Sequence, residues 1–154
     1  MRISAKADYA VRAALVLAQA DGAQVTAEEI ARAQTIPVRF LEAALRDLRK
    51  AGLVASRRGP GGGHRLSRSS AQISIAQVVR AIDGPLVFVN GERPSDLEYS
   101  GTASGLLPVW VAVRVAVRQV LDEVTLADVL EQRLMPEVQH LLDAAGAWDN
   151  EPPS

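Results

Sequence analysis

The sequence predicts a mainly α-helical protein with one small β-hairpin. Three observations predict this fold class. Apolar residues recur with helical spacing over most of the 154-residue chain, aromatic residues make up only 4 % of it, and one glycine-rich run, residues 59–63, separates two short strand-like segments. Ala, Val and Leu dominate the hydrophobic residues, which favours helices packed through aliphatic side chains.

The first half predicts three helices. Residues 5–20 are apolar nearly all round, so we expect a buried central helix. "TAEE" at 26–29 has the pattern of a capping box, in which Thr26 and Glu29 exchange hydrogen bonds, and it starts a short helix over 27–33. "QTIP" then breaks the chain before a third helix, 37–51, which Gly52 ends.

The third helix has two contrasting faces. One face is apolar and should contact the core through Phe40, Leu41, Ala44, Leu45 and Leu48. The other is a basic ridge at positions i, i+4, i+7 and i+11: Arg39, Ala43, Arg46 and Lys50. A charged stripe alone is more often an ordinary solvated face. Here it follows a helix–break–helix arrangement, which is typical of a DNA-binding helix-turn-helix.

A β-hairpin is predicted directly after this helix, from "LVASRR" (53–58) and "HRLS" (64–67). Together with the three helices it gives a winged helix-turn-helix. Gly61, Gly62 and Gly63 suit a tight wing tip, because glycine adopts positive φ and permits close backbone approach. The flanking arginines suit the negative potential of a DNA minor groove: Arg57, Arg58 and Arg65.

Other functions for these motifs find little support. A nucleotide-binding glycine loop needs a helix directly after it, and no helical pattern follows Gly63. His64 and His140 have no evident carboxylate and nucleophile nearby, and no His, Asp or Glu group has zinc spacing. We therefore expect neither an enzyme nor a metal site of this kind.

The second half predicts a helix capped by Ser74, a polar loop over 90–105, an apolar helix over 106–124 and a last short helix capped by Thr125. The long helix carries residues at the 3, 4, 3, 4 spacing of a helix–helix seam: Trp110, Val113, Val117, Val120 and Val124. The simplest partner is the same helix of a second copy, which makes a homodimer. The alternative is that the helix folds back onto its own chain.

Charge divides the chain. Residues 1–70 hold twelve Lys/Arg and six Asp/Glu, whereas residues 71–154 hold five and twelve, so a basic half precedes an acidic half. We expect the basic half to face a polyanion. The predicted division is a DNA-binding domain at 1–84, a sensing loop with a dimerisation helix at 85–149, and a disordered tail at 150–154.

The chain reads as cytoplasmic. Asp8 and Arg12 interrupt the features of a secretory signal, and no stretch approaches about 20 uninterrupted apolar residues, since 106–117 carries Arg114. We therefore expect no membrane association. The absence of cysteine excludes disulfides and thiolate-held metal centres.

Four segments, in this order, resemble the Rrf2 family of bacterial transcription regulators: "ISAKADYAVRAALVLA", "EEIARAQTIPVRFLEAALRDLRKAGLV", "SRRGPGGGHRL" and "ISIAQVVRAIDG". The resemblance implies a dimeric regulator that binds a partly palindromic operator, with 37–51 in the major groove and the wing, 57–65, in the minor groove. The implied DNA contacts are Arg39, Glu42, Arg46, Lys50, Arg57, Arg58, Gly61, Gly62, Gly63 and Thr26. Glu42 can accept from a cytosine amino group.

The chain departs from the family pattern in its sensor. Many relatives hold an iron–sulfur cluster through three cysteines in the loop that corresponds to 88–107, and this chain has none. We expect an unknown non-metal effector or a protein co-regulator instead. Its pocket would draw on Asp8, Tyr9, Arg12, Glu92, Tyr99, Trp110 and Arg114. The leading hypothesis is a repressor; the alternative is a protein-interaction subunit that keeps the fold but binds DNA weakly or not at all.

Overall fold

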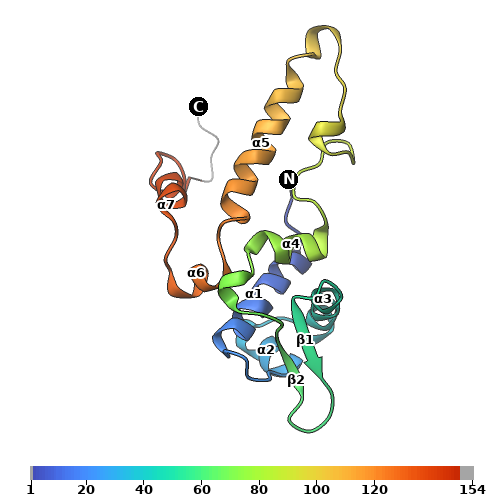
Figure 1. The fold of residues 1–154 in the computed structure, drawn as a ribbon, viewed down its shortest axis with the longest axis vertical. Coiled ribbons are helices and arrows are strands. Elements are labelled where there is room, and N and C mark those ends of the chain that lie inside the picture. The colour runs from blue at the N-terminus through green and yellow to red at the C-terminus, as the bar shows by residue number, and fades with distance from the viewer. Residues whose placement is uncertain (1, 150–154) are drawn as a thin grey trace.

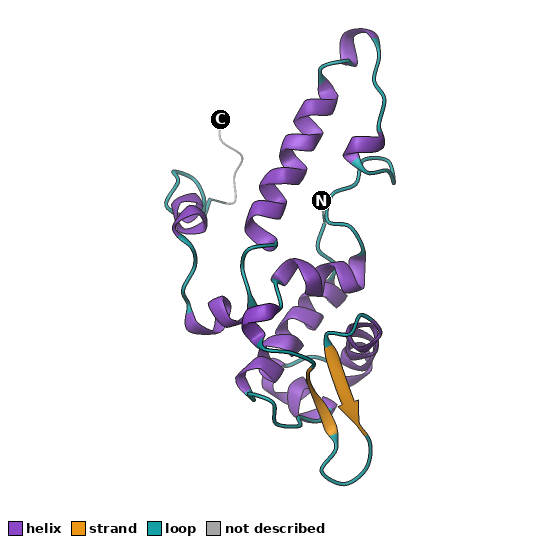
Figure 2. Ribbon diagram, in the orientation of Figure 1, coloured by secondary structure: helices purple, strands orange, loops and turns teal. Residues whose placement is uncertain are grey.

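The computed structural model describes residues 2–149. These residues form helices joined by loops, with one two-stranded antiparallel sheet (Figures 1 and 2). The mainly α fold with a small hairpin is therefore confirmed. The predicted disordered tail, 150–154, lies outside the described residues. The helices and strands are α1 (Ala5–Gln19), α2 (Ala27–Gln34), α3 (Val38–Lys50), β1 (Val54–Arg57), β2 (Gly63–Leu66), α4 (Ile75–Asp83), α5 (Leu106–Leu121), α6 (Leu126–Glu131) and α7 (Pro136–Leu142).

Helix α1 lies at the centre of the core, as its apolar sequence predicts. Its alanines let α3 and α4 pack closely against it, and Leu17 is fully buried. The capping box of α2 is present, with the Thr26 hydroxyl accepting from the backbone N–H of Glu29 at 3.2 Å. Thr35, at φ 53°, ends α2 in the left-handed conformation and turns the chain towards α3. The helix-turn-helix geometry thus follows from local capping and from burial of one face of each helix.

Two details of the expected helices are wrong. Phe40 was expected in the core, yet 44 % of its surface is exposed, because it lies about 100° around the helix from Leu41, which occupies the buried position. The chain also contains α7, which the sequence reading missed although Pro136 stands at a favourable first helical position.

The hairpin pairs Val54 with Leu66 and Arg57 with Gly63. Val25, which precedes α2, pairs with His64 of β2 in an isolated antiparallel bridge. The Val25 N–H donates to the His64 carbonyl at 2.9 Å, and the Val25 carbonyl accepts from the His64 N–H at 2.8 Å. The base of the wing is therefore fixed to the start of α2. Leu53, Val54 and Leu66 anchor it from inside the core.

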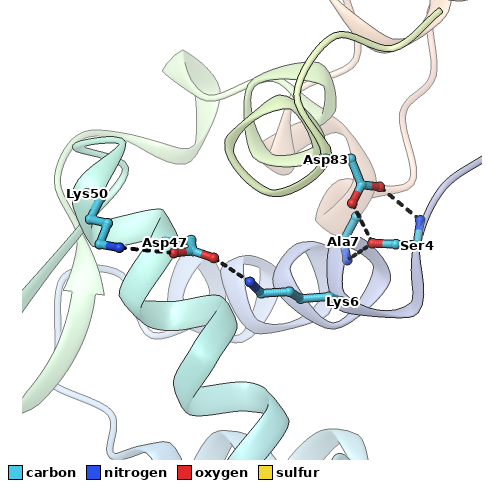
Figure 3. Close-up of polar contacts among 6 residues, drawn as sticks. All are labelled: Ser4, Lys6, Ala7, Asp47, Lys50 and Asp83. Atoms are coloured by element: carbon cyan, nitrogen blue, oxygen red, sulfur yellow. Dashed lines mark hydrogen bonds and ion pairs between the residues drawn. The ribbon is translucent and has the colours of Figure 1, made fainter. Parts of the chain in front are cut away.

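Polar contacts at the N-terminus fix α1 between α3 and α4 (Figure 3). The Ser4 N–H and hydroxyl donate to the two carboxylate oxygens of Asp83 at 2.9 and 2.5 Å, and the Ser4 hydroxyl also caps α1 by accepting from Ala7 N–H. Lys6 forms an ion pair with Asp47 of α3. This ion pair connects the start of the central helix to the helix with the basic ridge.

Helix α6 returns to the core after α5. Leu126 is fully buried with the first-half helices, its N–H donates to the Ile73 carbonyl, and the Ile75 N–H donates to the Val124 carbonyl. The division at residue 84 stays a prediction. It does not describe α6, which packs on the N-terminal core although it follows α5 in sequence.

Helix α5 extends away from this core, opposite to the wing (Figure 1). None of its residues is buried, and Val109, Val113 and Val115 are 40–50 % exposed. The expected helix was three residues too long. Val124 lies beyond its end and is buried in its own chain, so its assignment to the exposed seam is wrong.

Residues 101–121 form a helical stretch long and apolar enough to cross a membrane by length and composition, which corrects the expectation that no stretch comes close. A single helix of this kind is weak evidence for a membrane-spanning segment. Arg114 and Arg118 lie within it, and each costs about 2.5–3.5 kcal/mol at a bilayer centre.

Candidate nucleic-acid interface

The outer face of α3 carries four exposed charged residues: Arg39, Glu42, Arg46 and Arg49. They follow one another at intervals of three, four and three residues, so they lie on one face of the helix. The opposite face, with Leu41, Leu45 and Leu48, is buried. Of the predicted ridge, Arg39, Arg46 and Lys50 are exposed, whereas Ala43 is partly covered. Arg49 belongs to this face although the sequence reading omitted it; its spacing of three from Arg46 was the available signal.

Arg39 lies at the first turn of α3. Its guanidinium stacks over the ring of Phe40, 4.5 Å from the ring centroid, and Phe40 in turn lies 6.5 Å from Tyr9 of α1. This stacking explains what the exposed Phe40 does. It restricts the Arg39 side chain near the helix N-terminus, where a helix-turn-helix protein approaches base edges.

Two predicted contact residues already have partners in the chain. Lys50 Nζ lies 3.7 Å from Asp47 Oδ1, and Asp47 also binds Lys6 (Figure 3). The hydrogen bond and charge of Lys6, with the charges of Lys50 and Arg46, lower the pKa of Asp47. The Thr26 hydroxyl donates to Glu29 in the capping box. Lys50 and Thr26 stay predicted DNA contacts, and each already makes a polar contact inside the protein.

The wing places Arg57 and Arg58 at its exposed end, beside the glycine turn. The glycines are required by the protein's own backbone. A Cβ on Gly62 would lie 2.3 Å from the Arg57 carbonyl oxygen, and a Cβ on Gly63 would lie 2.7 Å from that of Val25. Gly61, at φ 68°, faces open space. The run therefore shapes the tip and lets the wing lie against Val25.

A hollow of about 330 Å³ lies between α3 and the base of the wing. His64 lines it from β2, and Glu42, Arg46 and Arg49 line it from α3. Partial burial, and then the charge of Arg49, lower the pKa of His64, while Glu28 acts in the opposite sense. His64 Nδ1 is buried without a hydrogen-bond partner among the described residues. The outer face of α3 and the base of the wing thus line one shared hollow.

The seven residues predicted for an effector pocket fall into four groups in the single chain. On α1, Asp8 pairs with Arg12 at 3.2 Å, and the Arg12 guanidinium lies 5.7 Å from the centre of the Tyr9 ring. Arg12 also bonds the Gln34 carbonyl, so it holds α1 to the end of α2. Trp110 Nε1 donates to the Tyr99 hydroxyl at 3.1 Å.

The other two predicted pocket residues lie apart from these contacts. Glu92 is in a turn that bridges Val89, and Arg114 lines a separate pocket beside α4. The predicted pocket required helix 1 of a second subunit, so it stays a prediction.

This geometry matches known regulators. The family model described as Rrf2, an iron-dependent transcriptional regulator, matches residues 3–132. The chain belongs to the Rrf2 family. Over 144 residues it is 49 % identical to Rv1287 of Mycobacterium tuberculosis, a predicted HTH-type transcriptional regulator, covering 93 % of this chain and 89 % of the relative. Over 144 residues it is 34 % identical to the HTH-type transcriptional regulator IscR of Vibrio cholerae, covering 93 % and 83 %.

Solved structures agree with the fold. IscR of T. potens superposes with a TM-score of 0.68 at 34 % identity, covering 90 % of this chain and 91 % of that one. CymR, the global cysteine regulator of B. subtilis, gives 0.67 at 29 % identity, covering 86 % and 98 %. This Rrf2 protein is therefore a winged helix-turn-helix, DNA-binding transcriptional regulator and not an enzyme.

The iron of the family description does not fit this chain as an iron–sulfur cluster. Such clusters are held chiefly by cysteine thiolates, and the chain contains no cysteine. Within residues 2–149, no group of three or more His, Asp or Glu side chains could hold a metal ion. Asp8, the acidic residue of the first turn of α1, pairs with Arg12.

Proposed function

We propose that this Rrf2 protein acts in the cytoplasm as a homodimeric repressor of a partly palindromic operator. The observation that carries the proposal is the set of exposed arginines on the outer face of α3 and on the wing, two elements that border one shared hollow. In each subunit, α3 enters a major groove and the wing enters the neighbouring minor groove. The α5 helices of the two subunits pack together and set the distance between the two α3 helices.

Base contacts are assigned to the first three turns of α3. Arg39 and Arg46 can each bind a guanine through the O6 and N7 acceptors, and Glu42 between them can accept from a cytosine amino group. A carboxylate in a phosphate-facing ridge would oppose binding, so its presence supports direct base reading. Lys50, Arg57, Arg58 and the N-terminus of α2 at Thr26 supply backbone and minor-groove contacts.

The dimer interface uses a face of α5 that is largely exposed within residues 2–149. Val109, Val113, Ala116 and Val120 follow the i, i+4, i+7, i+11 spacing, and the first three are exposed. Trp110 and Val117 of the predicted seam are more covered and lie to one side of this face. An apolar helix face of this length favours a second copy of the same helix.

Repression ends in response to a signal other than an iron–sulfur cluster. A small-molecule effector or a protein co-regulator serves this role. The loop 84–105 and α5 form the connection between the DNA-binding core and the dimer interface. A ligand in that region can change the relative position of the two α3 helices.

The experiment that tests the function is selection of bound sequences from genomic fragments by the purified full chain. We expect enrichment of one motif with two related half-sites, and nanomolar affinity that falls steeply as salt increases. Reporter transcription from the selected site should fall when the protein is supplied. An increase would identify an activator.

The alternative, a protein-interaction subunit with weak DNA binding, gives the opposite outcome. Selection would then return no motif, and residual binding would be the same for all sequences. Arg46→Ala would leave the recovered fragments unchanged. No contact in the single chain favours this alternative over operator binding.

A further inference from the structure

Four of the five basic residues in the acidic half of the chain line one pocket. Residues 71–154 contain five arginines, no lysine and twelve acidic residues. Arg80 from α4, Arg93 from the loop, and Arg114 and Arg118 from α5 surround a hollow of about 440 Å³. Only Arg133 lies elsewhere. Convergence of cations from three segments in an otherwise acidic region is not expected from random surface variation.

The pocket has one apolar wall. Gly84, at φ 76°, ends α4 and turns the chain, so that Pro85, Leu86 and Val87 lie beside the arginines. No Asp or Glu is among the lining residues. The volume lies within the range of about 300–1,000 Å³ that small-molecule sites occupy.

The charges in the pocket are only partly balanced. Asp122 binds two of the four arginines, with Oδ1 2.6 Å from Arg80 Nη1 and Oδ2 2.9 Å from Arg118 Nε. These hydrogen bonds, with that from Arg80 the larger influence, lower the pKa of Asp122. Arg93 and Arg114 make no ion pair or side-chain hydrogen bond within residues 2–149. Two guanidinium groups are thus left to bind an anion.

We propose that this four-arginine pocket binds a small organic anion with at least two negative charges. The guanidinium groups of Arg93 and Arg114 bind its carboxylate or phosphate oxygens, because arginine pairs with both groups through two parallel hydrogen bonds. Leu86 and Val87 contact its apolar part. Arg80 and Arg118, held by Asp122, contribute positive charge at the pocket edge.

The pocket is separate from the DNA surface. It lies between α4, the loop and α5, whereas the wing projects at the opposite end of the molecule (Figure 1). A phosphate of DNA bound along α3 therefore cannot be the expected anion. The pocket also differs from the effector site predicted from sequence, with which it shares only Arg114.

Isothermal titration of the full-length protein without DNA tests the site. The probes are citrate for polycarboxylates, pyrophosphate for organic phosphates, and inorganic phosphate as the minimal anion, all at constant ionic strength. We expect saturable binding of citrate or pyrophosphate, with inorganic phosphate weaker. Arg93→Gln and Arg114→Gln should each weaken binding about tenfold or more, because each removes a charge-assisted hydrogen-bond donor.

Arg133→Gln is the matched control, because Arg133 is an exposed arginine of the same half that pairs with Glu131 outside the pocket. It should leave the affinity unchanged. Absence of saturable binding for all three probes overturns the proposal, as does an equal loss for Arg133→Gln and Arg114→Gln, which would indicate general charge attraction. Thermal melts of the free variants check that each folds. Since the titrations contain no DNA, their result is independent of operator binding.

Discussion

The DNA-binding surface and the α4–α5 region both gather arginines, but in different geometries. On α3 and the wing the cations stand on an exposed helix face and a projecting hairpin, where a long polyanion can lie across them. Between α4 and α5 they line one hollow with an apolar wall, and two of the four, Arg80 and Arg118, share a single carboxylate, Asp122. The first arrangement suits a phosphate backbone and the second suits a molecule of limited size.

This difference has a physical consequence for substitution. Removing one cation from the exposed ridge changes one contact among several along the DNA. Removing one of the four arginines from the pocket removes a large share of the positive charge that surrounds a bound anion. The two regions nevertheless depend on each other in the proposed dimer, in which α5 sets where the two ridges lie on the operator. The strongest test of the comparison therefore changes α5 and measures DNA binding.

Val113→Asp should have the largest effect. It places a carboxylate in the centre of the exposed α5 face, and burying an unpaired charge there prevents dimerisation. We expect monomers in sedimentation experiments. The operator affinity should fall by more than about 100-fold, because a monomer contacts only one of the two half-sites. Val115→Asp is the control: Val115 is as exposed as Val113 but points about 160° away around the helix. Equal behaviour of the two variants would contradict the assigned face.

Arg46→Ala should cause the second-largest loss of operator affinity. A bidentate contact to guanine contributes about 1–3 kcal/mol, so the affinity for the selected operator should fall about 5- to 150-fold while the affinity for unrelated DNA falls less. Fluorescence anisotropy with both DNAs at one salt concentration measures this. Arg133→Ala, far from the ridge, should leave both affinities unchanged. A uniform loss on both DNAs would identify Arg46 as a phosphate contact.

The sequence predicts well what depends on local spacing. The two faces of α3, the capping box of α2, the N-caps Ser74 and Thr125 and the wing position follow from residues a few places apart, and the structure places them within one or two residues of the prediction. The four-arginine pocket could not be predicted in this way. Arg80 and Arg118 are 38 residues apart in sequence, and only the fold brings both to Asp122.

The errors have a related cause. Phe40 and Val124 were assigned from periodicity, which gives the face of a helix but not where neighbouring elements cover it. Phe40 falls at the edge of the α3 core face, beside Tyr9. Val124 follows the end of α5, where the chain returns to the core through Ile75. Periodicity alone cannot show where a helix ends against other parts of the protein.

Gly63→Ala tests whether the wing geometry matters only at the DNA-binding surface. The new Cβ would lie 2.7 and 2.8 Å from backbone atoms of Val25, which cannot move without displacing α2. We expect a loss of about 2 kcal/mol or more in the free energy of unfolding, measured with urea, and weaker DNA binding. Gly61→Ala should lower the free energy of unfolding by only about 1 kcal/mol, because the new Cβ meets open space and only the left-handed φ is unfavourable for alanine. Binding of citrate or pyrophosphate should change in neither variant.

His64 should give the smallest effect, a pH dependence of stability. Its pKa in the folded protein is lowered by burial and by Arg49, although Glu28 opposes this and Glu42 and Arg46 line the same hollow. The unfolded chain therefore binds a proton near pH 6.5 more readily than the folded chain does. The stabilising contribution is complete above about pH 7.5 and decreases as the pH falls towards about 5.5.

Thermal melts of wild type and His64→Gln over this window measure the contribution. We expect the melting temperature of wild type to fall more steeply with decreasing pH than that of the variant. The lowered pKa values of Glu29, Asp47, Asp122 and Asp128 affect stability only at lower pH, because their ordinary values lie near 4. Parallel curves would show that His64 does not titrate differently in the folded protein. A steeper curve for wild type would show that burial of His64, together with the charge of Arg49, disfavours its protonation in the folded protein.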